Sequence, residues 1–185
     1  AGCGSPSQAG GGFVSPRSDA VVKTDAEWQS TLTTEQFKIL RRQGTERPFS
    51  GKYWDSKDVG TYTCGGCGLP LFSSEAKFKS GTGWPSFTQP IAKDAIADTE
   101  DRSLAMSRTE ILCNRCGGHL GHVFEDGPPP TGQRYCVNGN ALDFLSDISS
   151  YVYIRYHKSL KERYLLDSDY SKTNLESLKK ISQTY

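Results

Sequence analysis

Residues 113–138 read CNRCGGHLGHVFEDGPPPTGQRYCVN, and both the fold and the chemistry that we expect depend on this stretch. It holds a Cys-x-x-Cys pair, His119 and His122, a turn rich in Gly and Pro, and a lone thiol at Cys136. Because proline fixes φ and glycine permits positive φ, the turn can be stiff and sharply reversed. It can therefore fold Cys136 and Asn138 back toward the histidines. A thiol, an imidazole and an amide would then supply a nucleophile, an acid or base, and a polar anchor.

Two Cys-x-x-Cys pairs predict a metal site. Each pair presents two thiolates at i and i+3 on a tight turn, and two such turns complete a tetrahedral zinc site; the four are Cys64, Cys67, Cys113 and Cys116. We expect one zinc ion per chain, tying two distant loops together. A closed four-cysteine site has no open position, so it would stabilise the fold and not catalyse.

Two other interpretations of these cysteines remain open. The pairs could be two separate redox-active dithiols. Alternatively, a site could use the second pair with the nearby histidines, namely Cys113, Cys116, His119 and His122. That site would crowd four ligands into a short segment and leave the first pair without a role.

The N-terminal part of the domain predicts two small helices. Thr24 can cap a short helix over residues 25–28. Thr33 and Gln36 form a capping-box pattern that begins a second helix, and Gly44 is its expected end.

The middle of the chain predicts short β-strands separated by Gly- and Pro-containing turns. Tyr53, Tyr62 and Phe72 are typical of strand segments, and paired or consecutive strands are expected over 104–107 and 109–112. Around the lone thiol, alternation puts Tyr135 and Val137 on the face opposite Cys136. The fold class is therefore mainly β.

The two ends differ from the middle in composition. Residues 1–19 are rich in Gly, Ser, Pro and Ala, which predicts a flexible tail before a domain over residues 20–145. The opening Ala-Gly-Cys is similar to the end of a bacterial lipoprotein signal, so an exported form anchored at Cys3 is one alternative. Residues 146–185 form a polar, charged extension in which we find no chemistry.

Length, charge and hydropathy exclude several classes. The 185 residues can bury one good core, and we expect a monomer. A formal net charge of +1 gives no strong field for nucleic acid or anionic membranes. The chain has no run of about 18 apolar residues, so no membrane span is predicted.

Three further segments accompany the two cysteine pairs. They are SGTGWPSF at 80–87, HLGHVF at 119–124 and RYCVN at 134–138. In this combination and order, the chain closely resembles the methionine-R-sulfoxide reductases of the B type, from about Thr24 to Phe144. The resemblance implies a β-tent of two antiparallel sheets with small N-terminal helices, and a zinc site away from the active site. It implies an oxidoreductase that repairs oxidised proteins and peptides, with free methionine sulfoxide as a further substrate and no organic cofactor.

The resemblance also implies residue roles. Cys136 matches the nucleophile that attacks the sulfoxide sulfur, releases methionine and is left as a sulfenic acid. His122, with His119 beside it, matches the acid that protonates the departing oxygen. Asn138 matches a hydrogen-bonding group of the same site.

The remaining matches line the substrate pocket. Trp84 matches the indole that packs against the S-methyl group, and Phe124 lines the same pocket. Arg134 is close enough in sequence to lower the pKa of the thiol as a nearby cation. Trp84 as a plain core residue, and His119 as a structural histidine, are the alternatives for those two positions.

One position departs from the pattern of many family members. They carry a second cysteine where this chain has Thr82, and that cysteine resolves the sulfenic acid as a disulfide that thioredoxin reduces. The chain resembles the single-cysteine subtype, which favours a plastid-type or cytoplasmic location. Glutathione or glutaredoxin would then reduce Cys136 directly, or Cys3 would resolve it from the tail.

Two other classes of protein account for fewer of these features. A zinc-ribbon-like binding module explains the four cysteines and the many turns. It does not explain why Cys136, the two histidines and Trp84 occur together. A structural disulfide protein fails on the placement of the cysteines.

Overall fold

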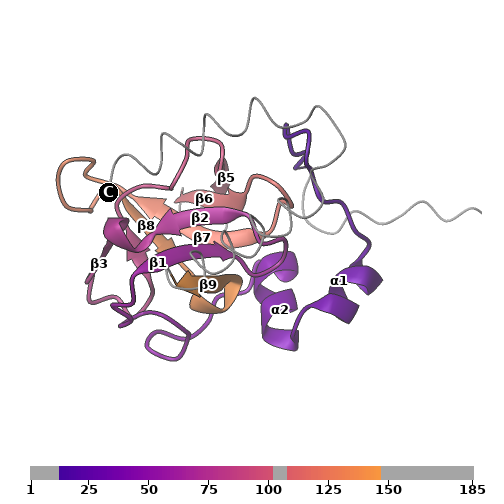
Figure 1. The fold of residues 1–185 in the computed structure, drawn as a ribbon, viewed down its shortest axis with the longest axis horizontal. Helices are drawn as coiled ribbons and strands as arrows, with labels where there is room; N and C mark the ends of the chain where they lie inside the picture. Colours follow the sequence, from indigo (N-terminus) through magenta and orange to yellow (C-terminus); the bar gives the residue numbers. More distant parts are fainter. Residues whose placement is uncertain (1–12, 102–107, 147–185) are drawn as a thin grey trace, which may run out of the picture. The chain divides into compact units, whose positions relative to one another are not determined.

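A computed structural model describes residues 13–101 and 108–146 of the chain (Figure 1). The chain divides into two compact units, Ala1–Asp147 and Ile148–Tyr185, and all described residues belong to the first. Cys3 and the strand expected over 104–107 lie outside the described residues.

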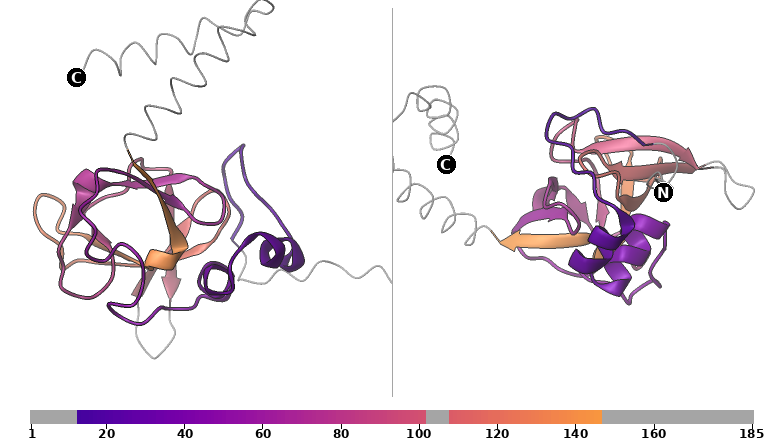
Figure 2. Two further views of the ribbon diagram at one scale, coloured as in Figure 1. Left: turned by 60° about the horizontal axis from the view of Figure 1, so that its bottom comes forward. Right: turned by 90° about the vertical axis from the view of Figure 1, so that its right-hand side faces the viewer.

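Two short helices precede the sheets and begin as the sequence predicts. Helix α1 spans Asp25–Thr31 and helix α2 spans Thr34–Arg42. Thr24 with Glu27, and Thr33 with Gln36, form complete capping boxes, in which each side chain bonds the other's backbone amide. The two helices lie together at one end of the sheets (Figures 1 and 2).

The expected end of the second helix was wrong by one residue. Gln43, and not Gly44, adopts the left-handed conformation, with φ 53°. The amide of Gly44 donates to the carbonyl of Lys38 at 3.0 Å. Gln43 also directs its side-chain amide toward Glu110 in the sheet, at 3.3 Å. The long amide side chain therefore has a use at this position that glycine could not serve.

The rest of the described chain forms two antiparallel sheets, which confirms the mainly β prediction. The smaller sheet has the order β2-β1-β9, from Pro70–Ser73, Gly60–Cys64 and Leu142–Ser146. The larger has the order β3-β4-β8-β7-β6-β5, from Lys77–Phe78, Ser86–Phe87, Arg134–Val137, His119–Phe124, Arg108–Cys113 and Ile96–Asp101. Two 3₁₀ turns, Ser74–Ala76 and Gly139–Ala141, follow β2 and β8.

One strand assignment needs correction, and one strand was not predicted. Tyr53 is not in a strand but in a bend, with φ 65°, and its ring lies against Tyr62 at 5.5 Å between centroids. Its aromatic character reflects core packing and not β structure. Strand β6 pairs with β7 on one side and with β5, Ile96–Asp101, on the other, and the sequence does not single out β5. Its outer residues are acidic and exposed, so it lacks a strong hydrophobic pattern.

An aromatic core joins the two sheets. Phe72 of the smaller sheet stacks on Phe87 of the larger one at 4.3 Å between ring centroids, and Tyr62 meets Phe87 edge-on at 5.1 Å. Tyr135 packs against Phe72 from strand β8. Phe72 and Phe87 are fully buried, and truncating such a side chain to alanine typically costs about 3–5 kcal/mol.

Alternation along strand β8 directs the lone thiol away from this core. Tyr135 and Val137 are buried, whereas Cys136 between them is partly accessible, as the sequence predicts. The larger sheet therefore has one face on the core and presents Cys136 on the other.

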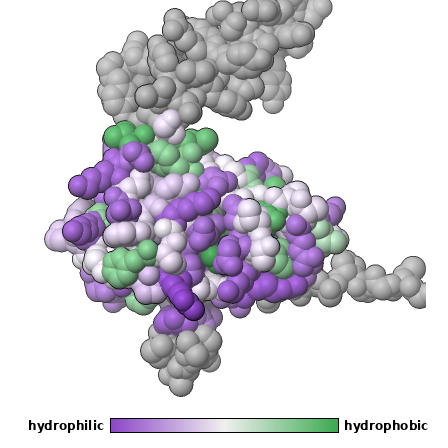
Figure 3. Space-filling view, turned by 90° about the horizontal axis from the view of Figure 1, so that it is seen from below, coloured by the Kyte–Doolittle hydropathy of each residue, from purple (hydrophilic) through white to green (hydrophobic). Residues whose placement is uncertain are grey.

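The surface mixes polar and apolar side chains, as Figure 3 shows for one face. Exposed large apolar residues occur at separated positions of the sequence, namely Val14, Val22, Phe49, Val59, Ile91 and Leu145. Single exposed residues of this kind are normal for a folded domain. Neither described helix has the length or apolar character that crossing a membrane requires.

Candidate metal centre and active site

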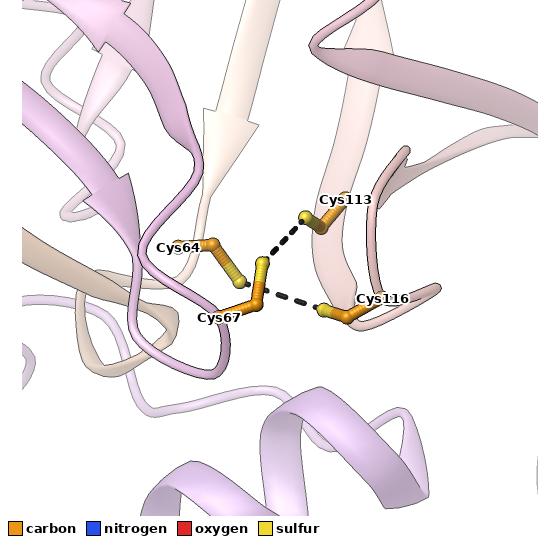
Figure 4. Close-up of side chains that lie close together, drawn as sticks. All are labelled: Cys64, Cys67, Cys113 and Cys116. Atoms are coloured by element: carbon orange, nitrogen blue, oxygen red, sulfur yellow. Dashed lines mark hydrogen bonds between the residues drawn. The ribbon is translucent and has the colours of Figure 1, made fainter. Parts of the chain in front are cut away.

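The four cysteines of the two Cys-x-x-Cys pairs converge on one point. Cys64 and Cys67 come from the turn that joins β1 to β2, and Cys113 and Cys116 from the turn that joins β6 to β7 (Figure 4). All four sulfur atoms lie within 4.8 Å of one another, with 3.7 Å from Cys64 to Cys116 and 3.5 Å from Cys67 to Cys113. Tetrahedral zinc with Zn–S bonds of about 2.3 Å separates its sulfurs by about 3.8 Å. The cluster is therefore close enough to bind a metal ion, and its size fits zinc.

Both cysteine turns have the same backbone design. Gly68 and Gly117 each follow their pair with positive φ, 74° and 67°. Their amides donate at 2.8 Å to the carbonyls of Cys64 and Cys113, the first cysteine of each pair. Only glycine adopts this conformation without strain, so each turn closes tightly enough to present two sulfurs on one side.

The segment before α1 and the end of α2 contact these turns. The amide of Val21 donates to the carbonyl of Arg115 at 2.9 Å, and the hydroxyl of Ser15 donates to the carbonyl of Asn114. Arg115 in turn donates to the carbonyl of Cys67 at 3.3 Å, and Arg41 of α2 donates to that of Cys116 at 3.0 Å. Ser15 belongs to the segment for which the sequence predicts a flexible tail.

On the larger sheet, Cys136 lies directly opposite His122. The two residues are register partners on strands β8 and β7. His122 is in turn opposite Glu110 on β6, and Cys136 is opposite Ser86 on β4. Opposite residues of an antiparallel pair share a face, with Cβ atoms about 4.5–5.5 Å apart. The structure thus brings the lone thiol and one of the two histidines side by side.

Gly121 permits this close approach of strands β7 and β8. It has φ 156°, and a Cβ atom there would lie 2.0 Å from the carbonyl oxygen of Cys136. Any larger residue would force the two strands apart next to His122. The glycine between the two histidines is thus required by the geometry of the thiol.

Two opposing effects act on the Cys136 thiol. Burial raises its pKa, and this effect is the largest. Hydrogen bonds from Arg134 and Thr82, with the positive charge of Arg134, act to lower it. The expected sign of the Arg134 effect is therefore right, but the net pKa of Cys136 lies above the ordinary thiol value because burial outweighs the cation.

Arg134 is itself held in a fixed orientation. Its guanidinium makes two hydrogen bonds to the carboxylate of Asp126, at 2.8 and 3.0 Å, and lies 4.5 Å from the centre of the Phe124 ring. The Gly-Pro turn between Asp126 and Arg134 brings the pair together. Phe124 thus flanks Arg134 and, at 6.4 Å between ring centroids, His122.

His119 and His122 are each paired with a carboxylate. His122 Nε2 lies 2.8 Å from Asp101 Oδ2, and His119 Nδ1 lies 2.5 Å from Glu110 Oε1. Burial lowers the pKa of His122, while Asp101 acts to raise it. His119 is only 3% exposed, and within the described residues its Nε2 atom has no hydrogen-bond partner. The two rings are 5.7 Å apart and meet edge-on.

Trp84 and Asn138 complete the set of predicted site residues. Trp84 is partly exposed and so is not a plain core residue. Asn138 is 3% exposed and donates from Nδ2 to the carbonyl of Leu120 at 3.0 Å. Both residues also hydrogen-bond to Glu46, through Trp84 Nε1 at 3.2 Å and Asn138 Oδ1 at 3.1 Å.

Four acidic residues of this region were missed by the sequence analysis, namely Glu46, Asp101, Glu110 and Asp126. Asp126 could have been found, since it stands just before the turn that returns the chain to Arg134. Asp101 and Glu110 lie on strands, and only the register of the sheet brings them to the histidines. Glu46 lies in the loop between α2 and β1 and bonds Trp84 and Asn138 instead. An acidic residue of this kind has no local sequence signal.

The chain matches a family model described as the SelR domain over residues 32–146. A relative from Methanosarcina barkeri, named peptide methionine sulfoxide reductase MsrB, is 56% identical over 128 residues, which are 69% of this chain and 90% of that protein. Proteins of the same name from Thiobacillus denitrificans and Hahella chejuensis are 58% and 57% identical, over 66% and 69% of this chain and 92% of each relative.

The two-sheet fold, the cysteine cluster and the matches together define an oxidoreductase that acts on oxidised sulfur. More narrowly, the chain belongs to the SelR family and is a peptide methionine sulfoxide reductase of the B type.

Proposed function

We propose that this chain reduces the R epimer of methionine sulfoxide with Cys136 as the nucleophile. The substrate is methionine sulfoxide within proteins and peptides, with the free form as a second substrate, and the role is repair after oxidative stress. The observation that carries the proposal is the pairing of Cys136 with His122 on adjacent strands. Thr82 and Arg134 support it, because both act to lower the pKa of the thiol.

The directions of the pKa shifts suggest how the reaction begins. Burial raises the pKa of Cys136 and lowers that of His122, so both groups are uncharged in the free enzyme near neutral pH. The thiol proton passes to His122 as the sulfur attacks, and Asp101 stabilises the resulting imidazolium. Arg134 and Thr82 stabilise the thiolate as it forms.

The chemical step then transfers oxygen between two sulfur atoms. The Cys136 sulfur attacks the sulfoxide sulfur, and His122 returns the proton to the sulfoxide oxygen. The oxygen ends on Cys136 as a sulfenic acid, and methionine leaves. The methionine sulfur has gained two electrons and the cysteine sulfur has lost two. Trp84 faces the S-methyl group, Phe124 lines the pocket, and Asn138 hydrogen-bonds in the site with His119 beside the acid.

Regeneration needs an external thiol. One glutathione or glutaredoxin thiol displaces water from the sulfenic acid and forms a mixed disulfide. A second thiol then releases Cys136 in the reduced form. Thioredoxin and the tail residue Cys3 are the alternatives. The protein acts as a monomer, and the four-cysteine cluster holds one structural zinc ion that takes no part in these steps.

The deciding experiment compares peptides that carry each sulfoxide epimer. Turnover should occur with the R epimer and not with the S epimer, in the presence of dithiothreitol and of glutaredoxin with glutathione. Turnover of the S epimer alone would overturn the stereochemical assignment. Zinc content without turnover of either epimer would favour the binding-module class.

A further inference from the structure

Glu46 is a buried carboxylate in the loop between α2 and β1. Its side chain and backbone are 8% exposed, among the lowest values for a charged residue in the described chain. A carboxylate in such a place must be hydrogen-bonded, because burying an unpaired charge is very unfavourable. The partners of Glu46 therefore indicate what it holds in place.

The backbone of Glu46 joins two residues to which the proposed function gives roles in the substrate pocket. Its carbonyl accepts a hydrogen bond from Trp84 Nε1 at 3.2 Å, and its amide donates to Asn138 Oδ1 at 3.1 Å. Trp84 lies before strand β4 and Asn138 follows β8. Glu46 therefore links the indole of Trp84 to the side-chain amide of Asn138.

The carboxylate of Glu46 fixes the chain just after the nucleophile strand. Oε1 accepts from the amide of Gly139 at 2.6 Å. Oε2 accepts from the amide of Asn140 at 3.0 Å and from its side chain at 2.9 Å. These charge-assisted bonds are roughly twice as strong as neutral ones. They anchor the turn on which Asn138 stands.

Two glycines show how closely the loop fits. A Cβ atom at Gly51 would lie 2.0 Å from Glu46 Oε1, and one at Gly139 would lie 1.9 Å from the carbonyl oxygen of Lys52. The loop from Glu46 to Lys52 therefore packs directly on the turn after β8. This leaves Glu46 little freedom to shift.

The loop also meets the segment that carries the indole. The amide of Phe49 donates to the carbonyl of Gly83 at 2.8 Å, next to Trp84, although this places Phe49 at φ 62°. A bulky residue in the left-handed region is strained, and such strain persists only where the surroundings enforce it.

We propose that Glu46 is a positioning residue that sets the separation of Trp84 and Asn138, and hence the width of the pocket for the S-methyl group. The inference rests on the proposed function, since it takes the pocket roles of these two residues from there. Glu46 does not touch the substrate. It acts by holding one wall of the pocket through its carbonyl and the other through its amide and carboxylate.

The test uses Glu46→Gln, with Glu35→Gln at an exposed position of α2 as the matched control. The amide nitrogen of Gln must face hydrogen-bond donors of Gly139 or Asn140, so it breaks the anchor with little change of volume. We expect kcat/KM for an R-sulfoxide peptide to fall about 10- to 100-fold, the range that loss of a hydrogen bond to a charged group represents. The control should retain wild-type kcat/KM.

The specific readout is discrimination between methionine sulfoxide and ethionine sulfoxide, which carries an S-ethyl group. One extra methylene typically changes kcat/KM by about 10- to 200-fold in a fitted pocket. Glu46→Gln should reduce this preference about fivefold or more, because the pocket is no longer held at one width. The rate of Cys136 alkylation by iodoacetamide should stay unchanged, since the hydrogen bonds of Glu46 lead to the pocket walls.

Two further variants keep the test decisive. Asn140→Ala removes only the side-chain bond to Oε2 and should reduce the preference in the same direction but less, even if Glu46→Gln does not fold. Trp84→Phe lacks the indole donor. If Trp84 and Glu46 act together, the double variant should show a smaller fold-decrease in kcat/KM than the product of the two single-variant decreases.

Several results would overturn the inference. An unchanged methyl-over-ethyl preference in folded Glu46→Gln or in Asn140→Ala would show that Glu46 has no role in the width of the pocket. A lower melting temperature with unchanged preference would show a purely structural role. If wild type reduces neither epimer, the proposed function fails and this inference fails with it. If wild type reduces the R epimer and the Glu46 variants behave as wild type does, the proposed function stands and this inference alone fails.

Discussion

Thr82 lies beside Cys136, and its hydroxyl acts to lower the pKa of the thiol. Ser80 lies behind Thr82, with 2.8 Å between the two hydroxyl oxygens, and Ser86 donates to Ser80 at 2.7 Å. Ser86, Ser80 and Thr82 therefore form a chain of three hydrogen-bonded hydroxyl groups. The family resemblance implies a resolving cysteine at the position of Thr82 in many members, and this implication leads to a prediction about recycling.

Thr82→Cys should form a disulfide with Cys136 after one turnover and raise thioredoxin-dependent activity, provided that the Cα atoms lie within about 7 Å. Peptide mapping of the oxidised protein would detect the bond. Ser50→Cys, an exposed site, is the control and should form none. Wild type should instead yield a sulfenic acid that dimedone traps. A Cys3–Cys136 disulfide in high yield would contradict the single-cysteine mechanism.

Cys136→Ser should abolish turnover, by at least about 10³-fold, because a hydroxyl is a far poorer nucleophile than a thiolate. The fold should be retained, since Cys136 faces away from the aromatic core. Circular dichroism and metal content would verify the folded state. Activity near the wild-type level would refute the assignment.

The protonation of Cys136 gives a pH prediction. Because burial raises its pKa, alkylation of Cys136 should increase with pH with a midpoint above the ordinary thiol value of about 8.5. Arg134→Gln removes a group that lowers the pKa, so the midpoint should move further up. Mass spectrometry of the Cys136 peptide across pH measures both. Arg42→Gln at the end of α2 should leave the midpoint unchanged, and a downward shift in Arg134→Gln would refute the model.

His122→Ala should reduce the single-turnover rate by about 10²- to 10⁴-fold with a smaller effect on substrate binding, because proton transfer matters mainly in the transition state. Rapid-quench measurement over a range of substrate concentrations separates the two effects. His119→Ala is the informative comparison, since the buried Nε2 atom of His119, unlike that of His122, lacks a hydrogen-bond partner among the described residues. A larger loss in His119→Ala would move the acid role to that residue.

The metal prediction concerns content and stability together. Purified protein should carry about one zinc per chain, and the double variant Cys64→Ser with Cys116→Ser should lose it. Its melting temperature should fall by roughly 10 °C or more, since each kcal/mol lost lowers the melting temperature of such a domain by about 4 °C. Elemental analysis and calorimetry would show this. A stable wild-type protein that contains no metal would refute the site.

The features that the sequence predicts well are local ones. The capping boxes at Thr24 and Thr33 depend on residues three positions apart, and the cysteine turns depend on four-residue motifs followed by glycine. Cys136 could be placed because alternation on one strand decides its face. The end of α2 was missed because a tertiary contact from Gln43 to Glu110 takes precedence over the usual preference for glycine.

The features that the sequence could not predict depend on register between strands. Asp101 reaches His122, and Glu110 reaches His119, only because strands β5, β6 and β7 pair in one alignment. A shift of one residue would turn each side chain to the opposite face. Tyr53 was assigned to a strand for a related reason, since aromatic residues are favoured both in strands and in cores.

The position of the cysteine cluster has a consequence for the cooperativity of unfolding. One pair ends a strand of the smaller sheet and the other ends a strand of the larger sheet, so a bound ion would join the sheets at a second point besides the aromatic core. With that ion in place, local opening of either sheet alone would require breaking metal–sulfur bonds. Backbone amides of β1 and β6 should then exchange with solvent deuterium at a common free energy, and chelation should separate them into two groups.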